Sequence, residues 1–314
     1  MSRGSASSAL LALVVLAVPA PASAHVRTDV VAVDYRARVL DVPALVARAA
    51  TVRVYAGDQA VGLTVRAGHR VIVLGYVGEP FIRIGPAGVA VDAASPTAAA
   101  TRLAGVHSHR RSIVWHDARI RTLPGGARHM TWQIHLIVDG RRVAVGGDIR
   151  RVARPSPWPW VALGAPFVLL VAFLIGRLRS AVEEASIRLG LLSAALTVAT
   201  ATSFALARSA SVGRWLEGAA ELVFSAIGVG VVARGPSDAR GVAGGALGLV
   251  AVSCAATKIP VFLHGVVLAA VPSTPARALV AATLWVGLAA TAAGLVVFFE
   301  LLERDEHTAL PYAS

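Results

Sequence analysis

The sequence has very little cysteine and very little lysine for its 314 residues. Cys254 is the one cysteine, which excludes a small scaffold built on internal disulfide bonds. Lys258 is the one lysine beside 29 arginines, and so one-sided a choice is typical of codon usage in a GC-rich genome. The net charge of +12 is therefore only weak support for a nucleic-acid partner, and we expect none.

Charged residues are also scarce, at 15%, and aromatic residues make up only 6%. Apolar residues make up 56% of the chain, whereas soluble domains average about 45–50%. This apolar content excludes an intrinsically disordered chain and disfavours a wholly soluble one. The composition therefore predicts an integral membrane protein.

Several familiar catalytic motifs are missing. The chain has no G-x-x-x-x-G-K-[ST] phosphate loop, no G-x-S-x-G nucleophile elbow, no H-E-x-x-H zinc helix and no C-x-x-C pair. Catalysis by these routes is unsupported, and we predict a protein that is not an enzyme.

What is present begins with a pattern typical of a secretory signal peptide over residues 1–24. Arg3 precedes an apolar run over 9–18, and Ala22 and Ala24 form a cleavage pattern. Ten residues of helix rise only about 15 Å, too little for a hydrocarbon core of about 30 Å. We expect cleavage to leave His25 as the first mature residue. An uncleaved anchor is the alternative.

The rest of the chain divides into two regions at the proline-rich segment 155–159. Residues 25–157 carry 19 arginines, nine acidic residues and seven of the nine histidines, without an apolar run of membrane length. Residues 158–314 carry ten basic and nine acidic residues within a series of long apolar runs. The expected domains are an extracytoplasmic domain over 25–154, a transmembrane domain over 155–305 and a tail over 306–314.

The first region is predicted to be an immunoglobulin-like β-sandwich. The expected strands are short and β-branched, and cover 30–39, 51–55, 63–66, 70–74, 80–84, 131–138 and 141–145. Asp139-Gly140 predicts a type I′ hairpin turn. Residues 87–126, rich in Ala, Gly, Ser and His, are expected to form long loops. So many short strands at turn spacing favour two packed sheets.

The second region is predicted to be an all-α bundle of about five transmembrane helices. The expected spans cover 158–176, 187–207, 215–233, 242–271 and 277–301. Lys258 and Pro260 interrupt the fourth run, which we interpret as one kinked span; two short spans, and six in total, remain the alternative. A cleaved signal would place the first region outside the plasma membrane, in modest agreement with the positive-inside rule.

Histidines of the first region are candidate metal ligands. A terminal His25 would offer its α-amino and ring nitrogens, a set that suits Cu(II). His107 and His109 would share one side of an extended segment, and His116 stands beside a carboxylate of the kind that orients metal-binding histidines. Solvated loop histidines beside arginines are the alternative. The candidate ligands are His25, His107, His109, His116, Asp117 and His135.

Three ionisable residues within the apolar runs are candidate functional groups, because charges at membrane depth tend to be paired or functional. Glu221 and His264 are expected at similar depths in the outer leaflet, so we predict that they approach each other. Lys258 precedes Pro260, where a broken helix would need a donor for its freed carbonyl groups. That structural role and a role in transport both stay open.

Four segments resemble a set of actinobacterial polytopic membrane proteins that have a signal peptide and a β-rich ectodomain. They are VLGYVGEPFIR over 73–83, WHDAR over 115–119, VDG over 138–140 and PSPWPW over 155–160. The resemblance implies the same architecture and brings no established activity. More distantly, the layout is similar to copper-resistance proteins that join a CopC-type sandwich to a CopD-type membrane domain. That similarity implies a Cu(II) ligand at His25 alone, because the Asp-x-His pair and the methionine-rich site of that family have no counterpart.

Two functions follow as predictions. The first is an integral membrane protein whose extracytoplasmic domain binds membrane lipid or another envelope component without catalysis. The second is extracytoplasmic copper binding and handling, coupled to the membrane domain.

Overall fold

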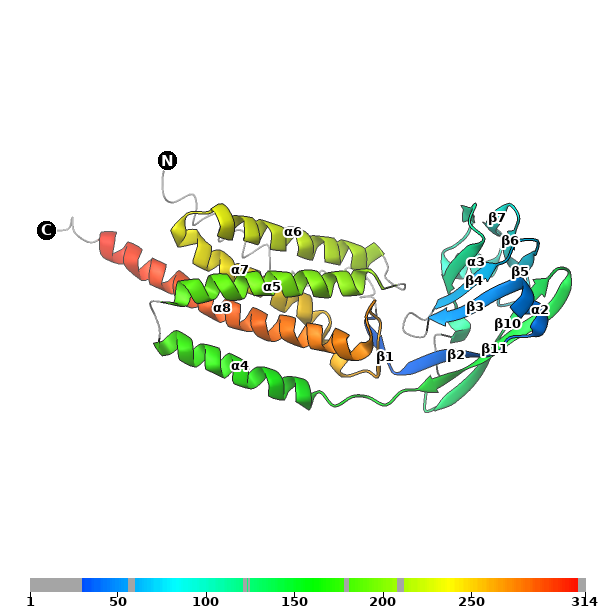
Figure 1. Ribbon diagram of the computed structural model, residues 1–314, viewed down its shortest axis with the longest axis horizontal. Coiled ribbons are helices and arrows are strands. Elements are labelled where there is room, and N and C mark those ends of the chain that lie inside the picture. The colour runs from blue at the N-terminus through cyan, green and yellow to red at the C-terminus, as the bar shows by residue number, and fades with distance from the viewer. Residues whose placement is uncertain are drawn as a thin grey trace. The chain divides into compact units, whose positions relative to one another are not determined.

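The computed structural model describes residues 30–55, 60–120, 123, 125–177, 181–207 and 212–309. The chain forms two compact units (Figure 1). One unit is Ala32–Arg154 and is rich in strands, and the other contains the helices from Pro155 onward together with Val30 and Val31. The expected signal peptide and His25 lie outside the described residues.

The β-rich unit contains two antiparallel sheets. The larger has the strand order β2 (Tyr35–Asp41), β11 (Arg141–Arg151), β10 (His129–Val138), β5 (Val71–Leu74), β6 (Pro80–Gly85), β7 (Gly88–Val91) and β8 (His107–Ser108). The smaller has the order β3 (Ala50–Tyr55), β4 (Ala60–Val65) and β9 (Ser112–His116). The remaining elements are β1 (Ala32–Val33), α2 (Ala44–Ala49), α3 (Pro96–Thr101) and the 3₁₀ turn η1 (Ala118–Ile120).

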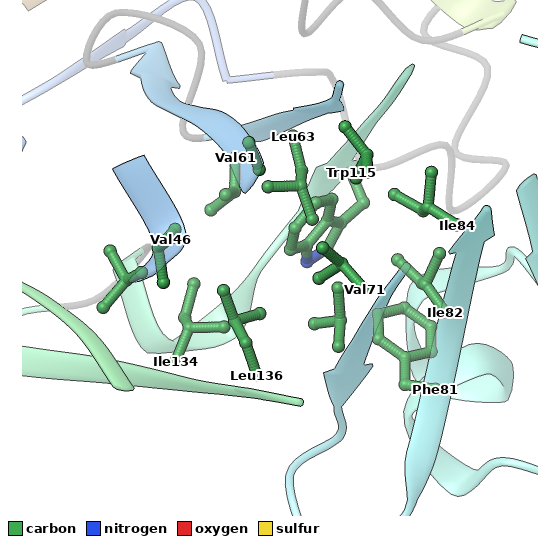
Figure 2. Close-up of a cluster of buried hydrophobic side chains, with 14 of the residues drawn as sticks. Val46, Val61, Leu63, Val71, Phe81, Ile82, Ile84, Trp115, Ile134 and Leu136 are labelled. Atoms are coloured by element: carbon green, nitrogen blue, oxygen red, sulfur yellow. The ribbon is translucent and has the colours of Figure 1, made fainter. Parts of the chain in front are cut away.

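One hydrophobic core joins the two sheets. Side chains from both contribute to it, as Figure 2 shows for Leu63 and Trp115 of the smaller sheet and Phe81 and Leu136 of the larger. The rings of Phe81 and Trp115 meet edge to face, with their centroids 6.4 Å apart. The strand pattern predicted for β10 is confirmed, because its alternate residues are buried here. A β-rich domain is thus present, and its immunoglobulin-like form stays a prediction.

The β10–β11 hairpin turns as predicted. Asp139 has φ 49° and Gly140 has φ 85°, the pair of positive φ angles that a type I′ turn requires. The expectation of long loops over 87–126 was wrong, because this stretch contains β7, α3, β8, β9 and η1. Its alanines form the short helix α3, which Ser95 caps by accepting a hydrogen bond from the Ala98 N–H.

In the part of the chain that the structure describes, the helical unit has five long helices: α4 (Trp158–Arg177), α5 (Val182–Ala205), α6 (Val212–Arg234), α7 (Ser237–Ala256) and α8 (Ser273–Ala309). Four of them, α5 to α8, are long and apolar enough to cross a membrane, and the apolar stretch of α4 is shorter. These lengths and compositions indicate a multi-pass membrane protein.

Glycines set the closest helix contacts. A β-carbon added at Gly190 of α5 would lie 2.5 Å from the backbone of Gly244 in α7. One added at Gly245 would lie 2.6 Å from the Cα atom of Gly294 in α8. Helix α7 therefore packs against both neighbours through small residues, as membrane helices commonly do where hydrophobic burial cannot drive association.

The fourth apolar run does not form the continuous kinked helix that we expected. Helix α7 ends at Ala256, and the connection to α8 holds only the 3₁₀ turn η3 (Ile259–Phe262) and the short strand β12 (Val266–Val267). Pro260 has no backbone N–H and cannot continue an α-helix, which explains the break. The run thus supplies one long helix, followed by irregular backbone over 257–272.

Candidate functional site

Lys258 lies directly after α7 with only 3% of its side chain exposed. Its Nζ atom donates hydrogen bonds to Oε1 of Glu217 and to Oε1 of Glu221, both at 3.0 Å. It also donates to the carbonyl oxygen of Cys254 at 3.0 Å and to Oγ1 of Thr257 at 3.2 Å. The last carbonyl groups of a helix have no N–H partner within that helix. By donating to the Cys254 carbonyl oxygen, Lys258 takes the structural role that we expected where the helix is broken.

The two carboxylates come from one face of α6, because Glu217 and Glu221 stand four residues apart. Their environments differ. The Glu217 side chain is 39% exposed and accepts a second hydrogen bond from Thr257 at 2.7 Å, whereas the Glu221 side chain is 11% exposed. Oε2 of Glu221 is buried without a hydrogen-bond partner. The site therefore has a water-facing carboxylate and an enclosed one.

Two further groups enclose the ammonium group. Nζ lies 3.6 Å from Sγ of Cys254 and 5.9 Å from the centre of the Phe204 ring of α5. The aromatic face offers a weak attraction to the cation. Helices α5, α6 and α7 thus all supply a wall of this site, which we call the Lys258 site.

Glu221 pairs with Lys258, and its predicted approach to His264 stays a prediction. The backbone around His264 accepts hydrogen bonds from Arg277. Arg277 donates to the carbonyl oxygens of Val261 at 2.8 Å, His264 at 2.7 Å and Gly265 at 3.1 Å.

A second buried arginine stabilises the same connection between α7 and α8, residues 257–272. Arg214 donates to the carbonyl oxygens of Leu268 and Val30. Buried backbone carbonyl groups need hydrogen-bond partners, and two guanidinium groups supply them here. Sequence reasoning missed this role, although Pro260, Gly265 and Pro272 close together were a usable signal for irregular backbone.

The candidate metal ligands of the β-rich unit lie apart. His107 on β8 and His135 on β10 are four strand spacings apart in the larger sheet, or about 19 Å. His116 belongs to the smaller sheet, and His109 follows β8 in a bend, so the extended segment expected to align it with His107 ends before it. Within the described ranges, no three His, Cys, Asp or Glu residues are grouped so that they could hold a metal ion.

Asp117 is occupied by structural partners. It is fully buried and accepts hydrogen bonds from the Trp115 indole N–H at 2.9 Å and from Arg119 Nε and Nη2 at 2.9 and 2.7 Å. The guanidinium carbon of Arg119 lies 5.2 Å from the centre of the Tyr76 ring, whose hydroxyl oxygen accepts from the Ala118 N–H. The segments 73–83 and 115–119 therefore contact each other and stabilise the fold.

Glu79 in the first of these segments caps α3. Its Oε1 accepts hydrogen bonds from Ser95 Oγ at 2.8 Å and from the Thr97 N–H at 3.2 Å. Partial burial acts to raise the pKa of Glu79, but the hydrogen bonds from Thr97 and Ser95 outweigh it and lower that pKa to about 2. Gly75 leaves room for this carboxylate, since a β-carbon there would lie 2.0 Å from Oε1.

The outer face of the larger sheet is strongly basic. Cross-strand partners point to the same side of a sheet, and Arg36, Arg150 and His129 form one row across β2, β11 and β10. Asp148 on this face is fully buried and pairs with Arg150. The exposed basic residues of this arginine face are Arg36, Arg38, Arg83, Arg142, Arg150, His107, His129 and His135.

No family model, curated protein or solved structure matches this chain. The similarity to copper-resistance proteins stays a prediction that depends on His25. The Lys258 site and the arginine face are the two arrangements from which function can be inferred.

Proposed function

We propose that this chain is a multi-pass protein of the plasma membrane whose β-rich unit lies on the extracytoplasmic side and binds anionic phospholipid head groups without catalysis. The arginine face carries this proposal. Five exposed arginines occupy one face of a single sheet, where Asp148 is buried and pairs with Arg150, and Arg83 forms an exposed ion pair with Asp92.

Arginine suits this partner for a geometric reason. Its planar guanidinium group donates two parallel hydrogen bonds to a phosphate, which a lysine ammonium cannot do. Neighbouring strands hold Arg36 and Arg150 side by side, about 5 Å apart at their Cα atoms. A row of this kind presents several donors to closely spaced phosphate groups.

An extracytoplasmic location of the unit would suit such a partner. A signal peptide over 1–24 and a first membrane helix beginning at Trp158 would leave the β-rich unit outside, joined to the membrane by the short segment 152–157. A tether of this length keeps a basic domain close to the bilayer, where each arginine contributes about 1 kcal/mol of attraction to an anionic surface.

The test uses the full chain in nanodiscs of zwitterionic lipid, mixed with phosphatidylglycerol or phosphatidylcholine vesicles and separated by flotation. The variant is R36Q/R38Q/R142Q, which leaves Arg150 to pair with the buried Asp148. We expect its binding to phosphatidylglycerol vesicles to be about 10-fold to 100-fold weaker than that of the wild type. Binding of the wild type should also weaken as salt rises.

The matched control is R48Q/R66Q/R102Q, which removes the same charge from exposed positions outside the arginine face. We expect this control to change binding by less than about threefold, since only general charge is lost. Equal weakening by both variants, or equal binding of the wild type to both vesicles, would overturn the proposal.

A further inference from the structure

We propose that Glu221 is a proton-binding site within the membrane unit, where Oε2 carries a proton while Lys258 and Glu217 are ionised. This proposal is independent of lipid binding by the β-rich unit. It concerns a different group of residues and a different ligand.

The charge balance of the Lys258 site is the first argument. One ammonium group faces two carboxylates, and Lys258 donates to one oxygen of each at the same distance of 3.0 Å. With both carboxylates ionised, the single ammonium group cannot compensate both charges. A charge without compensation is very costly away from water, so one carboxylate is expected to bind a proton.

The exposure of the two carboxylates decides which one is protonated. Glu217 is 39% exposed and accepts hydrogen bonds from Lys258 and Thr257 on one oxygen, so water and two donors stabilise its charge. Glu221 is 11% exposed, and its Oε2 is buried without a partner. Burying a neutral hydroxyl group at this oxygen costs far less free energy than burying a charged carboxylate oxygen there. The proton is therefore placed on Glu221.

Among the residues that the structure describes, Arg214 is the other cation near the site, and it stands three residues before Glu217 on α6, so its charge favours the ionised form of Glu217. From α7 and the turn after it, the Cys254 thiol and Lys258 face the Glu221 carboxylate, and from α5 the Phe204 ring lies 5.9 Å from the ammonium group. On α6 the neighbouring charged groups are Glu217 and Arg214. Arg214 hydrogen-bonds to backbone carbonyl oxygens of the connection and of Val30.

Glu217 also gives the proton a route to water. Both carboxylates contact the same ammonium group, and the exposed one lies nearer the start of α6. On release, Glu221 becomes a carboxylate and its proton passes to water beside Glu217. On uptake, the same proton returns from water to Oε2, and Lys258 stays an ammonium group in both states.

The test is labelling with dicyclohexylcarbodiimide, an apolar reagent that adds to protonated carboxyl groups, followed by peptide mass spectrometry. With the full chain in nanodiscs, we expect at least about tenfold more adduct at Glu221 than at Glu217. Above the midpoint of its titration, labelling of Glu221 should fall about tenfold per pH unit, because the reactive acid form declines at that rate. This profile needs no variant.

Two variants sharpen the result. Glu221→Gln should abolish the adduct, and Glu217→Gln should lower labelling of Glu221 at neutral pH by at least about tenfold, because one carboxylate then pairs with one ammonium group. A role of Glu221 in packing alone predicts unchanged labelling in Glu217→Gln. That result, or absence of the adduct throughout the pH range in which the chain stays folded, would overturn the proposal.

Discussion

The two units of this protein use cationic side chains in opposite ways. The β-rich unit displays most of its arginines to solvent, where an ion pair contributes only about 0–1 kcal/mol. The membrane unit buries Arg214, Lys258 and Arg277 and gives each of them oxygen acceptors. The same type of group is thus exposed to water in one unit and is a buried donor to carbonyl and carboxylate oxygens in the other. Changes to single charges should therefore have much larger effects on the membrane unit.

The largest expected effect follows from removing the buried ammonium. Lys258→Met leaves two carboxylates and the Cys254 carbonyl group without their shared donor, and should lower the free energy of unfolding by about 3–5 kcal/mol. Thermal unfolding of the full chain in detergent measures the loss.

A matched variant separates charge from packing at this position. The triple variant K258M/E217Q/E221Q removes the whole set of charges, and should recover most of the lost stability because no uncompensated ion remains. If the triple variant is as unstable as Lys258→Met, the ammonium group is not what stabilises this end of α7.

The next effect concerns helix packing in the membrane unit without any charge. Gly245→Val places a side chain where the Cα atom of Gly294 lies 2.6 Å from the β-carbon position, so α7 and α8 must move apart. We expect a loss of about 2–3 kcal/mol, measured by thermal unfolding. Gly230→Val on α6 is the control, because a β-carbon there meets no atom within 4 Å. Similar losses in both variants would show that helix propensity, and not contact, is responsible.

Asp117→Asn tests one of the two buried carboxylates, Asp117 and Asp148, that the described part of the β-rich unit holds among its exposed charges. It removes a charged acceptor from Arg119 and Trp115, and should cost about 2 kcal/mol, because Arg119 is 19% exposed and regains water. Hydrogen exchange of β9 and β5 amides in the full chain reports this loss locally. Asp139→Asn, at an exposed pair with His69, is the comparison and should cost less than Asp117→Asn, because water screens this pair. Equal protection of the β9 and β5 amides from exchange in Asp117→Asn and Asp139→Asn would contradict the structural role of Asp117.

How far the sequence could predict these features depends on how local their causes are. Alternation predicted β10, and Asp139-Gly140 predicted its turn, because both follow from neighbouring residues. Length and hydropathy predicted four of the long helices as candidate spans.

Features set by contacts distant in sequence could not be predicted in the same way. The i, i+4 spacing placed Glu217 and Glu221 on one face, but their partner Lys258 lies 41 and 37 residues away, respectively. It follows a helix end that the continuous apolar run gave no sign of. Asp117 stood out as a possible ligand beside His116. Its burial with Arg119 depends on how the two sheets meet.

The smallest effect is expected at Glu79, and it depends on pH. Its pKa in the folded chain is about 2, below the ordinary value of 4.5, so its charge stabilises the fold above about pH 4.5 and that contribution is lost as pH falls toward 2. Glu79→Gln keeps the shape and removes the charge at the start of α3, and should cost about 1 kcal/mol at pH 7 after allowance for solvent screening. Hydrogen exchange of α3 amides at pH 7 and near pH 2 measures the difference in stability between Glu79→Gln and the wild type. This difference should shrink at the lower pH, as the wild-type carboxylate takes up its proton. A difference that stays constant with pH would mean that the hydrogen-bond geometry, and not the charge, is what Glu79 contributes to the cap.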